Sequence, residues 1–397
     1  MTTFPDRSHE LFDQMVSLRR TLHQYPELGF REVKTSALLA SHLEEYGLKV
    51  EQGIAKTGLV ARIEGKHSRV NGMLRFDMDA LPIQEETGLD FASLNPGVMH
   101  ACGHDGHMVI GLTTARMLQE KAKSLDGNLR FIFQPAEEGD GGAKRMISEG
   151  VLENPRLDFL LGLHLWNEKP LGWVGIKSGP LMAASDTIEI QVKGKGGHGG
   201  LPQQTVDPLV CSAQIVTALQ SIVSRNLSPF DNAVLSLTAI HGGTVFNIIP
   251  DEINIKGTLR TFEPNIRERV LQRMREIVQG IAAAMGCAGT INVTEVTSPV
   301  VNDPQIANYV KEIVSTKYPS LTIDDIYQTT VSEDFAFYLE QIPGCFILFG
   351  SANPAKGKLY SHHHPKFDFD EDALPIAAAL MADCSSDLLQ RFSKSLD

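Results

Sequence analysis

The alternation of fully apolar strands with amphipathic helices is the feature that most limits how this chain can fold. The segments DFLLGLHL at 158–165 and GCFILFG at 344–350 are almost wholly apolar, whereas a strand with one solvent face would alternate. Helical periodicity lies between such segments, for example over 108–122 in MVIGLTTARMLQEKA. Strands that are buried on both faces and separated by helices indicate a mainly parallel sheet covered by helices.

The pattern changes in the middle of the chain, where strands and helices follow the order β-α-β-β-α-β of the ferredoxin-like unit. These six segments occupy, in order, residues 187–196, 207–225, 233–243, 251–262, 265–286 and 290–297. We therefore expect an α/β protein of two domains. Residues 1–183 and 298–397 form the larger domain, and residues 184–297 form a smaller inserted one.

Charge and cysteine content disfavour several classes of protein. Of the 397 residues, 48 are acidic and 36 are basic, and the resulting net charge of −12 disfavours binding to nucleic acids and anionic membranes. The five cysteines form no CxxC pair, so we expect a reducing compartment and no disulfide framework. The N-terminal segment lacks the apolar stretch of a signal peptide, and no segment has the roughly 20 apolar residues of a membrane span. We therefore expect a cytoplasmic protein.

Cysteine and histidine are concentrated in two short segments. Residues 99–107 read MHACGHDGH, with Cys102 and three histidines, and residues 362–364 are all histidine. A thiolate and imidazoles in one glycine-containing loop suit a borderline-soft divalent metal ion. The alternative is a polar loop whose histidines bond to the backbone, but the density of these residues favours a metal site.

Two adjacent carboxylates follow the strand-like segment NLRFIF. In QPAEEG, one of Glu137 and Glu138 can bind a metal ion while the other acts as a general base for hydrolysis. A solvated acidic turn is the alternative for this pair alone. His164 lies near the end of the apolar segment at 158–165. Because sites in open α/β sheets lie beyond the carboxyl ends of the strands, we expect these groups to converge.

The inserted domain supplies three further candidates. His198 stands between glycine pairs in GGHGG, where the backbone can approach a ligand and the imidazole can donate to a developing oxyanion. Asn247 lies in VFNIIP, and Arg260 lies on the following strand, where it can receive a carboxylate. A flexible turn and a surface arginine are the alternative interpretations of these motifs.

Nearly the whole chain resembles one family. The resemblance is carried, in order, by LHQYPELGFRE, LRFDMDALPIQEETGL, MHACGHDGHM, QPAEEGDGGAKRMISEGVL, GLHLWN, GKGGHGGLPQQTVDP, GGTVFNIIP and HHPKFDFDEDALP. The family is that of the metal-dependent amidohydrolases, which includes aminoacylases, hippurate hydrolases and auxin-conjugate hydrolases. It belongs to a clan of dinuclear metallo-aminopeptidases and carboxypeptidases.

The resemblance implies a catalytic domain and a ferredoxin-like lid that forms a homodimer or a larger homo-oligomer. It implies two divalent metal ions per subunit, Zn²⁺ or Mn²⁺, with Ni²⁺ and Co²⁺ as alternatives. The implied ligands are Cys102, His104, Glu138, His164 and His363, with His362 or His364 as alternatives to the last. Two positions depart from relatives. Gln203 stands where a histidine is common, and Asp77-Met78-Asp79 replaces a His-x-Asp ligand pair, so Asp77 and Asp79 are assigned supporting roles only.

The implied reaction converts an N-acyl-L-amino acid and water into a carboxylic acid and a free amino acid. Glu137 is implied as the general base and His198, in relatives often the partner subunit's, as the group that stabilises the oxyanion. Asn247 and Arg260 are implied to hold the substrate carboxylate.

Several alternatives remain at this point. Those within the clan are a dipeptidase or carboxypeptidase and a deacetylase of the N-acetyl-diaminopimelate type. Those from other classes are a cysteine nucleophile, Cys102 beside His104, and a non-catalytic binder of metal or conjugates. The Glu137-Glu138 pair argues against the binder, which needs no base.

Overall fold

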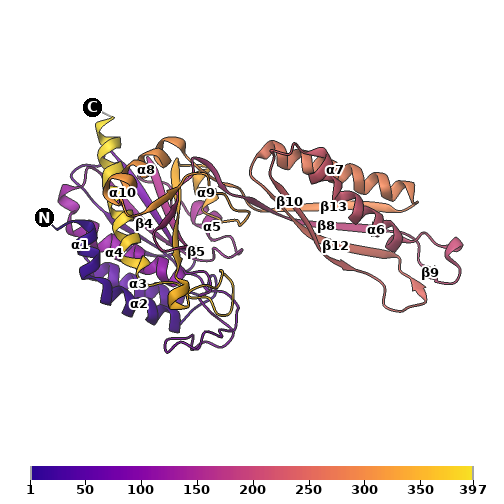
Figure 1. The fold of residues 1–397 in the computed structure, drawn as a ribbon, viewed down its shortest axis with the longest axis horizontal. Coiled ribbons are helices and arrows are strands. Elements are labelled where there is room, and N and C mark those ends of the chain that lie inside the picture. The colour runs from indigo at the N-terminus through magenta and orange to yellow at the C-terminus, as the bar shows by residue number, and fades with distance from the viewer. Residues whose placement is uncertain (1, 396–397) are drawn as a thin grey trace. The chain divides into compact units, whose positions relative to one another are not determined.

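The structure is a computed structural model that describes residues 2–395, and the chain forms two compact units (Figure 1). The first unit contains Met1–Gly179, Val301–Tyr327 and Asp334–Asp397. The second contains Pro180–Val300 together with the short segment Gln328–Glu333.

The first unit is built on an eight-stranded sheet whose centre is parallel. Strands β4, β3, β5 and β16 run parallel to one another, and antiparallel pairs of β1 with β2, β2 with β4 and β16 with β6 extend the sheet on both sides. The strand order is β1-β2-β4-β3-β5-β16-β6-β15. The strands are β1 (Lys49–Ile54), β2 (Gly58–Ile63), β3 (Asn71–Asp77), β4 (Asn128–Gln134), β5 (Phe159–Pro170), β6 (Trp173–Gly175), β15 (Thr322–Asp324) and β16 (Gly344–Ala352).

Helices cover both faces of this sheet. Helices α4 and α10 pack against each other on one face, with α1, α2, α3 and α8 around them. Helices α5 and α9 pack together on the opposite face (Figure 1). The helices are α1 (Phe4–Glu10), α2 (Phe12–Gln24), α3 (Val33–Glu45), α4 (His104–Glu120), α5 (Gly142–Ser148), α8 (Pro304–Lys317), α9 (Ala336–Leu339) and α10 (Ala373–Lys394).

Strand β5 shows why the apolar segments are continuous. Leu161, Leu163 and Leu165 belong to the core under α4 and α10. Gly162 faces the other way, where an added Cβ would lie 2.7 Å from Phe335 and from Phe346. Both faces of the strand are therefore packed, and the predicted α/β fold with a helix-covered sheet is confirmed.

The second unit has the predicted β-α-β-β-α-β order and a four-stranded antiparallel sheet in the order β10-β12-β8-β13. Its elements are β8 (Ala184–Lys193), α6 (Pro208–Leu219), β10 (Ala233–His241), β12 (Glu252–Thr261), α7 (Pro264–Ala284) and β13 (Ala288–Thr297). Alternate residues of β8, namely Ile188, Ile190 and Val192, pack with α6 and α7. Asp207 caps α6 by accepting the amides of the next two non-proline residues, as its position before Pro208 predicts.

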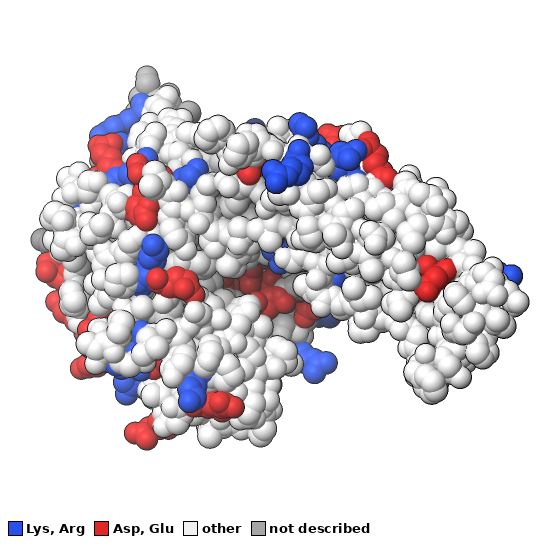
Figure 2. All heavy atoms as spheres, turned by 45° about the vertical axis from the view of Figure 1, so that its right-hand side comes forward, with Lys and Arg blue, Asp and Glu red and all other residues white. Residues whose placement is uncertain are grey.

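Short elements complete the fold. Strand β7 (Gly179–Met182) pairs with β14 (Val300–Asn302), and β9 (Gly197–His198) pairs with β11 (Ile248–Ile249). Three 3₁₀ turns and one π-helical turn cover Ala122–Ser124, Pro202–Gln204, Pro354–Lys356 and Ile222–Asn226. On the face shown in Figure 2, basic and acidic side chains are interspersed, and neither sign forms a continuous band.

No helix in the described part of the chain combines the length and apolar character needed to cross a bilayer. The five cysteines are all buried and none is in a disulfide. The expectation of a cytoplasmic location stays a prediction.

Candidate metal centre

Cys102 and His104 are presented by the start of α4. Gly103, between them, has φ of 86°, a left-handed conformation that glycine adopts without penalty, and it turns the chain into the helix. Gly106 lies in the first turn of α4, where an added Cβ would be only 2.7 Å from Leu165 Cδ1. The missing side chain therefore allows the helix start to lie directly against β5.

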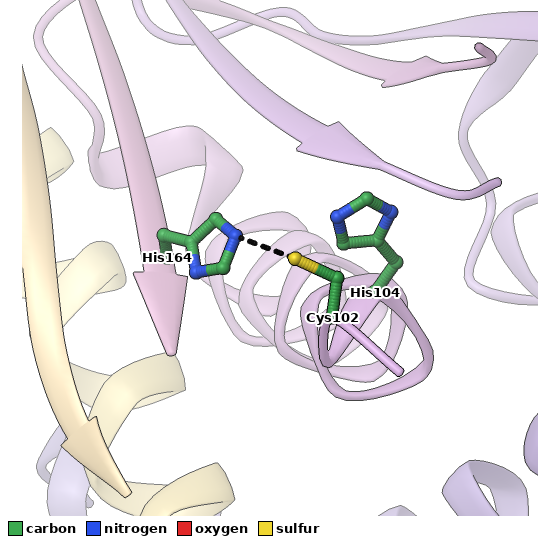
Figure 3. A group of neighbouring side chains, drawn as sticks. All are labelled: Cys102, His104 and His164. Atoms are coloured by element: carbon green, nitrogen blue, oxygen red, sulfur yellow. Dashed lines mark hydrogen bonds between the residues drawn. The ribbon is translucent and has the colours of Figure 1, made fainter. Parts of the chain in front are cut away.

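The close approach of α4 to β5 brings His164 to the same place (Figure 3). His164 Nε2 lies 3.5 Å from Cys102 Sγ. Donor atoms of Cys102, His104 and His164 all lie within 4.8 Å of one another, and all three side chains are buried.

Both imidazoles are held with one nitrogen turned to this cluster. His104 Nδ1 donates to the Asp79 carbonyl at 2.9 Å, and His164 Nδ1 donates to the Leu165 carbonyl at 2.6 Å. Because a carbonyl only accepts, each Nδ1 carries a proton, and Nε2 is the nitrogen left to bind a cation. His104 Nε2 is buried and has no hydrogen-bond partner in the described chain. This is the arrangement that metal-binding histidines adopt.

Glu137 and Glu138 follow β4 at the carboxyl edge of the sheet. The backbone N–H of Glu138 donates to Asp79 Oδ2 at 3.0 Å, and Glu138 Oε1 lies 4.0 Å from His104 Nε2. Glu137 Oε1 accepts the backbone N–H of Asp334 at 3.4 Å. Donor atoms of His104, Glu137 and Glu138 form a second group within 4.8 Å.

The three consecutive histidines have different surroundings. His363 Nε2 lies 3.2 Å from Glu138 Oε1, and Cys102, Glu138 and His363 form a third group of donors. His362 Nε2 donates to the Leu165 carbonyl at 2.9 Å. The ring of His364 stacks on Tyr360 with centroids 4.5 Å apart. Of the three, His363 is therefore the one that reaches the other predicted ligands.

The site concentrates negative charge around its thiol and imidazole donors. Burial raises the pKa of the Cys102 thiol well above its usual range, and the carboxylates of Glu138 and Glu137 raise it further. Burial lowers the pKa of His104, but the carboxylates of Asp77 and Asp79 outweigh it and raise that pKa to about 10. Burial keeps the pKa of His164 well below its usual value. A divalent cation fits these donors, because it neutralises the carboxylates and favours the thiolate.

Sequence reasoning missed the supporting roles of His107 and Arg75 behind the cluster. His107 Nδ1 donates to Asp77 Oδ1 at 2.6 Å, and His107 Nε2 accepts the Leu165 amide at 2.9 Å, so both of its nitrogens are engaged. Arg75 donates to Asp77 and, at 2.9 Å, to Asp334. The predicted supporting role of Asp77 agrees with these contacts. One signal was available: Arg75 and Asp77 are two residues apart in β3, so their side chains lie on the same face of the strand.

The second unit separates its three candidate residues. His198 and Asn247 lie together, because Ile248 pairs with His198 and the Gly199 amide donates to the Asn247 carbonyl at 2.8 Å. Arg260 lies near the far end of β12. At about 3.4 Å per residue, the eight steps from Glu252 to Arg260 span about 27 Å. Arg260 and Asn247 of one chain therefore cannot hold the same small carboxylate.

A parallel-centred α/β sheet with thiol, imidazole and carboxylate donors at its strand ends defines a metal-dependent hydrolase. Comparison with known proteins extends this. The profile of peptidase family M20/M25/M40 matches residues 73–387. The chain is 40% identical over 382 residues to N-acetyl-L-cysteine deacetylase of Bacillus subtilis (strain 168), covering 96% of this chain and 90% of that protein.

Two further comparisons agree. The chain is 36% identical over 393 residues to the IAA-amino acid hydrolase ILR1-like 4 of Arabidopsis thaliana, covering 98% of this chain and 89% of that protein. The crystal structure of the Bacillus subtilis YxeP protein, a dinuclear metal binding peptidase from the M20 family, matches with a TM-score of 0.85 at 36% identity. That match covers 96% of this chain and 99% of the other.

The chain belongs to peptidase family M20/M25/M40. It is a metal-dependent amidohydrolase, and its centre binds divalent metal ions. The resemblance predicted from the sequence motifs is confirmed.

Proposed function

We propose that this enzyme hydrolyses the amide bond of N-acyl-L-amino acids, releasing a carboxylic acid and a free amino acid. The observation that carries the proposal is the position of Glu137. Its carboxylate lies within 4.8 Å of donor atoms of His104 and Glu138, and His104 also belongs to the group with Cys102 and His164. The deacetylase and IAA-amino acid hydrolase relatives act, by their names, on amino acids acylated at nitrogen. Their substrates share the amino acid and differ in the acyl group.

Five residues would hold the metal ions. Two overlapping donor groups share the Cys102 thiol, one with His104 and His164 and the other with Glu138 and His363. We assign these five as the ligands of two divalent ions per subunit. Thiol and imidazole donors favour Zn²⁺, whereas the carboxylates also suit Mn²⁺, with Ni²⁺ and Co²⁺ as alternatives.

When bound, the ions would supply Lewis-acid polarisation of the amide carbonyl and of water. Glu137 takes the proton of the attacking water and delivers it to the leaving nitrogen. The amide of Asp334 donates to Glu137 Oε1 and so limits the directions in which this carboxylate can point. His198 donates to the developing oxyanion.

The lid residues favour a homodimer. Arg260 lies about 27 Å along β12 from Glu252, and Asn247 precedes the Glu252 end of this strand, beside β11. The two residues would therefore contact one small substrate only if two subunits contribute. We propose that the partner subunit's His198 and the partner subunit's Asn247 complete the metal centre, and that Arg260 is supplied by a different subunit from Asn247. His198 Nδ1 accepts the Gly200 amide at 2.9 Å, which leaves Nε2 to face the substrate.

A mixed-oligomer experiment tests this arrangement. Glu137→Gln and His198→Ala subunits are each expected to be inactive alone. Mixed oligomers formed by co-expression should recover activity, because one shared site then contains both intact groups. If mixing restores nothing while both variants bind metal and each other, His198 acts within its own subunit.

The proposed reaction is tested with acetyl, benzoyl and indole-acetyl amino acids on native, chelated and metal-restored protein. Activity should disappear on chelation and return with Mn²⁺ or Zn²⁺. Glu137→Gln should retain metal and lose most turnover, and near-normal turnover would overturn the assignment of the base. Faster hydrolysis of dipeptides than of every acyl-amino acid would instead support the dipeptidase or carboxypeptidase alternative.

A cysteine nucleophile is disfavoured by the site itself. The raised pKa of the Cys102 thiol keeps it protonated at neutral pH unless a cation is bound. Activity that survives complete chelation would revive this alternative.

A further inference from the structure

The turn that carries Glu137 has a backbone conformation that few residues adopt. Ala136, directly before Glu137, has φ of 56°, in the left-handed region that favours glycine. Ala136 is also completely buried. Non-glycine residues in this region persist only where their surroundings hold them, and they are concentrated at functional sites. What holds Ala136 therefore also sets the position of Glu137.

Glu32 holds the N–H side of this residue, while the Ala136 carbonyl accepts the Gly142 amide at 3.0 Å. Glu32 Oε1 accepts the backbone N–H of Ala136 at 3.0 Å, and its Oε2 accepts the hydroxyl of Thr57 at 2.6 Å. Glu32 stands at the N-cap of α3, where a carboxylate ordinarily accepts amides of its own helix. It makes no such bond. Its side chain is instead directed to the turn that precedes Glu137.

The segment around Glu32 also packs against the turn. An added Cβ on Gly29 would lie 3.0 Å from Ala136 Cβ and 3.1 Å from Ala136 Cα. On the other side of Glu137, the Glu138 amide donates to Asp79. Glu137 therefore lies between two backbone amides that are each held by a carboxylate.

A contribution to stability does not explain why a glutamate occupies position 32. Its side chain is 0% exposed, and burial raises its pKa to about 7, with the Thr57 hydrogen bond only partly opposing the shift. A carboxylate that resists ionisation in this way destabilises the folded chain at neutral pH. An apolar residue of similar size would avoid this cost.

We propose that Glu32 is a positioning residue for hydrolysis, which fixes the left-handed Ala136 turn and thereby aims the Glu137 carboxylate. This inference rests on the proposed role of Glu137 as the general base. Without the acceptor, Ala136 relaxes toward negative φ, and Glu137 moves from its place beside the metal donors. Glu32 acts through Ala136 and is not itself a catalytic residue.

The test compares variants of two kinds. Those at position 32 change the acceptor of the Ala136 N–H, and the one at position 136 removes the strain of the positive φ. With N-acetyl-L-cysteine as probe and Mn²⁺-loaded protein, Glu32→Ala should lower kcat by about 10- to 100-fold and change KM little. Glu32→Gln should stay close to wild type, because its amide oxygen still accepts from Ala136 while its NH₂ donates to Thr57. Metal content, measured by atomic emission, should be unchanged in both.

A second substitution separates positioning from stability. Glycine adopts positive φ without penalty, so adding Ala136→Gly to Glu32→Ala should restore part of the lost kcat. Asp158→Ala is the matched control, because Asp158 Oδ2 holds the Asn71 amide at 2.8 Å at the opposite edge of the sheet. This control should lower the melting temperature without changing kcat. If Glu32→Ala does not fold, Glu32→Asp is used instead. Its side chain is shorter, so its carboxylate no longer reaches the Ala136 N–H.

Unchanged kcat in Glu32→Ala, or a loss that Ala136→Gly does not relieve, would overturn the inference. Full activity in Glu137→Gln would instead overturn the proposed base. The two failures are therefore distinguished by measuring both variants on the same substrate.

Discussion

Replacing Glu32 by glutamine should stabilise the catalytic unit at alkaline pH and leave its stability almost unchanged near pH 5. Burial raises the pKa of Glu32 from 4.5 to about 7. Because one pH unit of pKa difference is worth about 1.4 kcal/mol, the ionised carboxylate costs the folded state about 3 kcal/mol. Glutamine keeps the hydrogen-bonding capacity and removes the charge.

The sign follows from proton binding. Between pH 4.5 and about 7 the folded wild type holds a proton on Glu32 that the unfolded chain has already released. Wild-type stability therefore decreases relative to Glu32→Gln as the pH rises through this window, and the difference is constant above it.

Urea unfolding at pH 5, 6, 7 and 8 measures this difference. Both tryptophans of the chain, Trp166 in β5 and Trp173 in β6, lie in the same unit as Glu32, so their fluorescence reports the unfolding of that unit. Glu32→Gln should exceed wild type by about 3 kcal/mol at pH 8 and by little at pH 5. An equal difference at both pH values would refute the reasoning.

Four further substitutions test the centre and its supports. His363→Ala should lower metal affinity by more than about 100-fold, whereas His364→Ala should lower it little, and titration calorimetry with Mn²⁺ compares them. Gly106→Ala should destabilise by about 1–3 kcal/mol, since its Cβ would meet β5 at 2.7 Å; unchanged thermal unfolding would contradict this close packing. Arg75→Met should destabilise by about 3–5 kcal/mol, because it leaves the carboxylates of Asp77 and Asp334 buried without their cation, and urea unfolding measures the loss.

The fold of the first unit was predictable because strands that are buried on both faces have continuously apolar sequences. Strand β5 lies between β3 and β16, with helices on both sides, so neither of its faces needs polar side chains. The second unit was predictable because the residues of β8 alternate between the helix side and the open side of its sheet. The segment Gln328–Glu333, which packs with that unit, gives no such signal because it is short and irregular.

The sequence also grouped the candidate site residues, since the carboxyl ends of parallel strands meet at one edge of a sheet. It could not separate His362, His363 and His364. Their directions depend on a local turn in which His363 has φ of 64°, a conformation that residue type does not predict. Glu32 ends the motif LHQYPELGFRE, but nothing in that motif indicates what its side chain contacts.

The distance between Arg260 and Asn247 was equally hidden. Both residues belong to motifs of one domain, and the family resemblance implied that they hold the same carboxylate. The extended run of β12 separates them, because Arg260 lies near one end of this strand and Asn247 precedes its other end, outside the four-stranded sheet.

The return of Gln328–Glu333 to the second unit has a consequence for protein engineering. The chain passes between the units four times, after Gly179, Val300, Tyr327 and Glu333. The Thr329 amide donates to the Leu181 carbonyl at 3.1 Å, and the Ala183 amide donates to the Val331 carbonyl at 3.2 Å. A chimera that takes only residues 180–300 from a relative would therefore pair that relative's segment with residues 328–333 of this chain. Exchanging the second unit between members of this family requires that both of its segments, Pro180–Val300 and Gln328–Glu333, are replaced together.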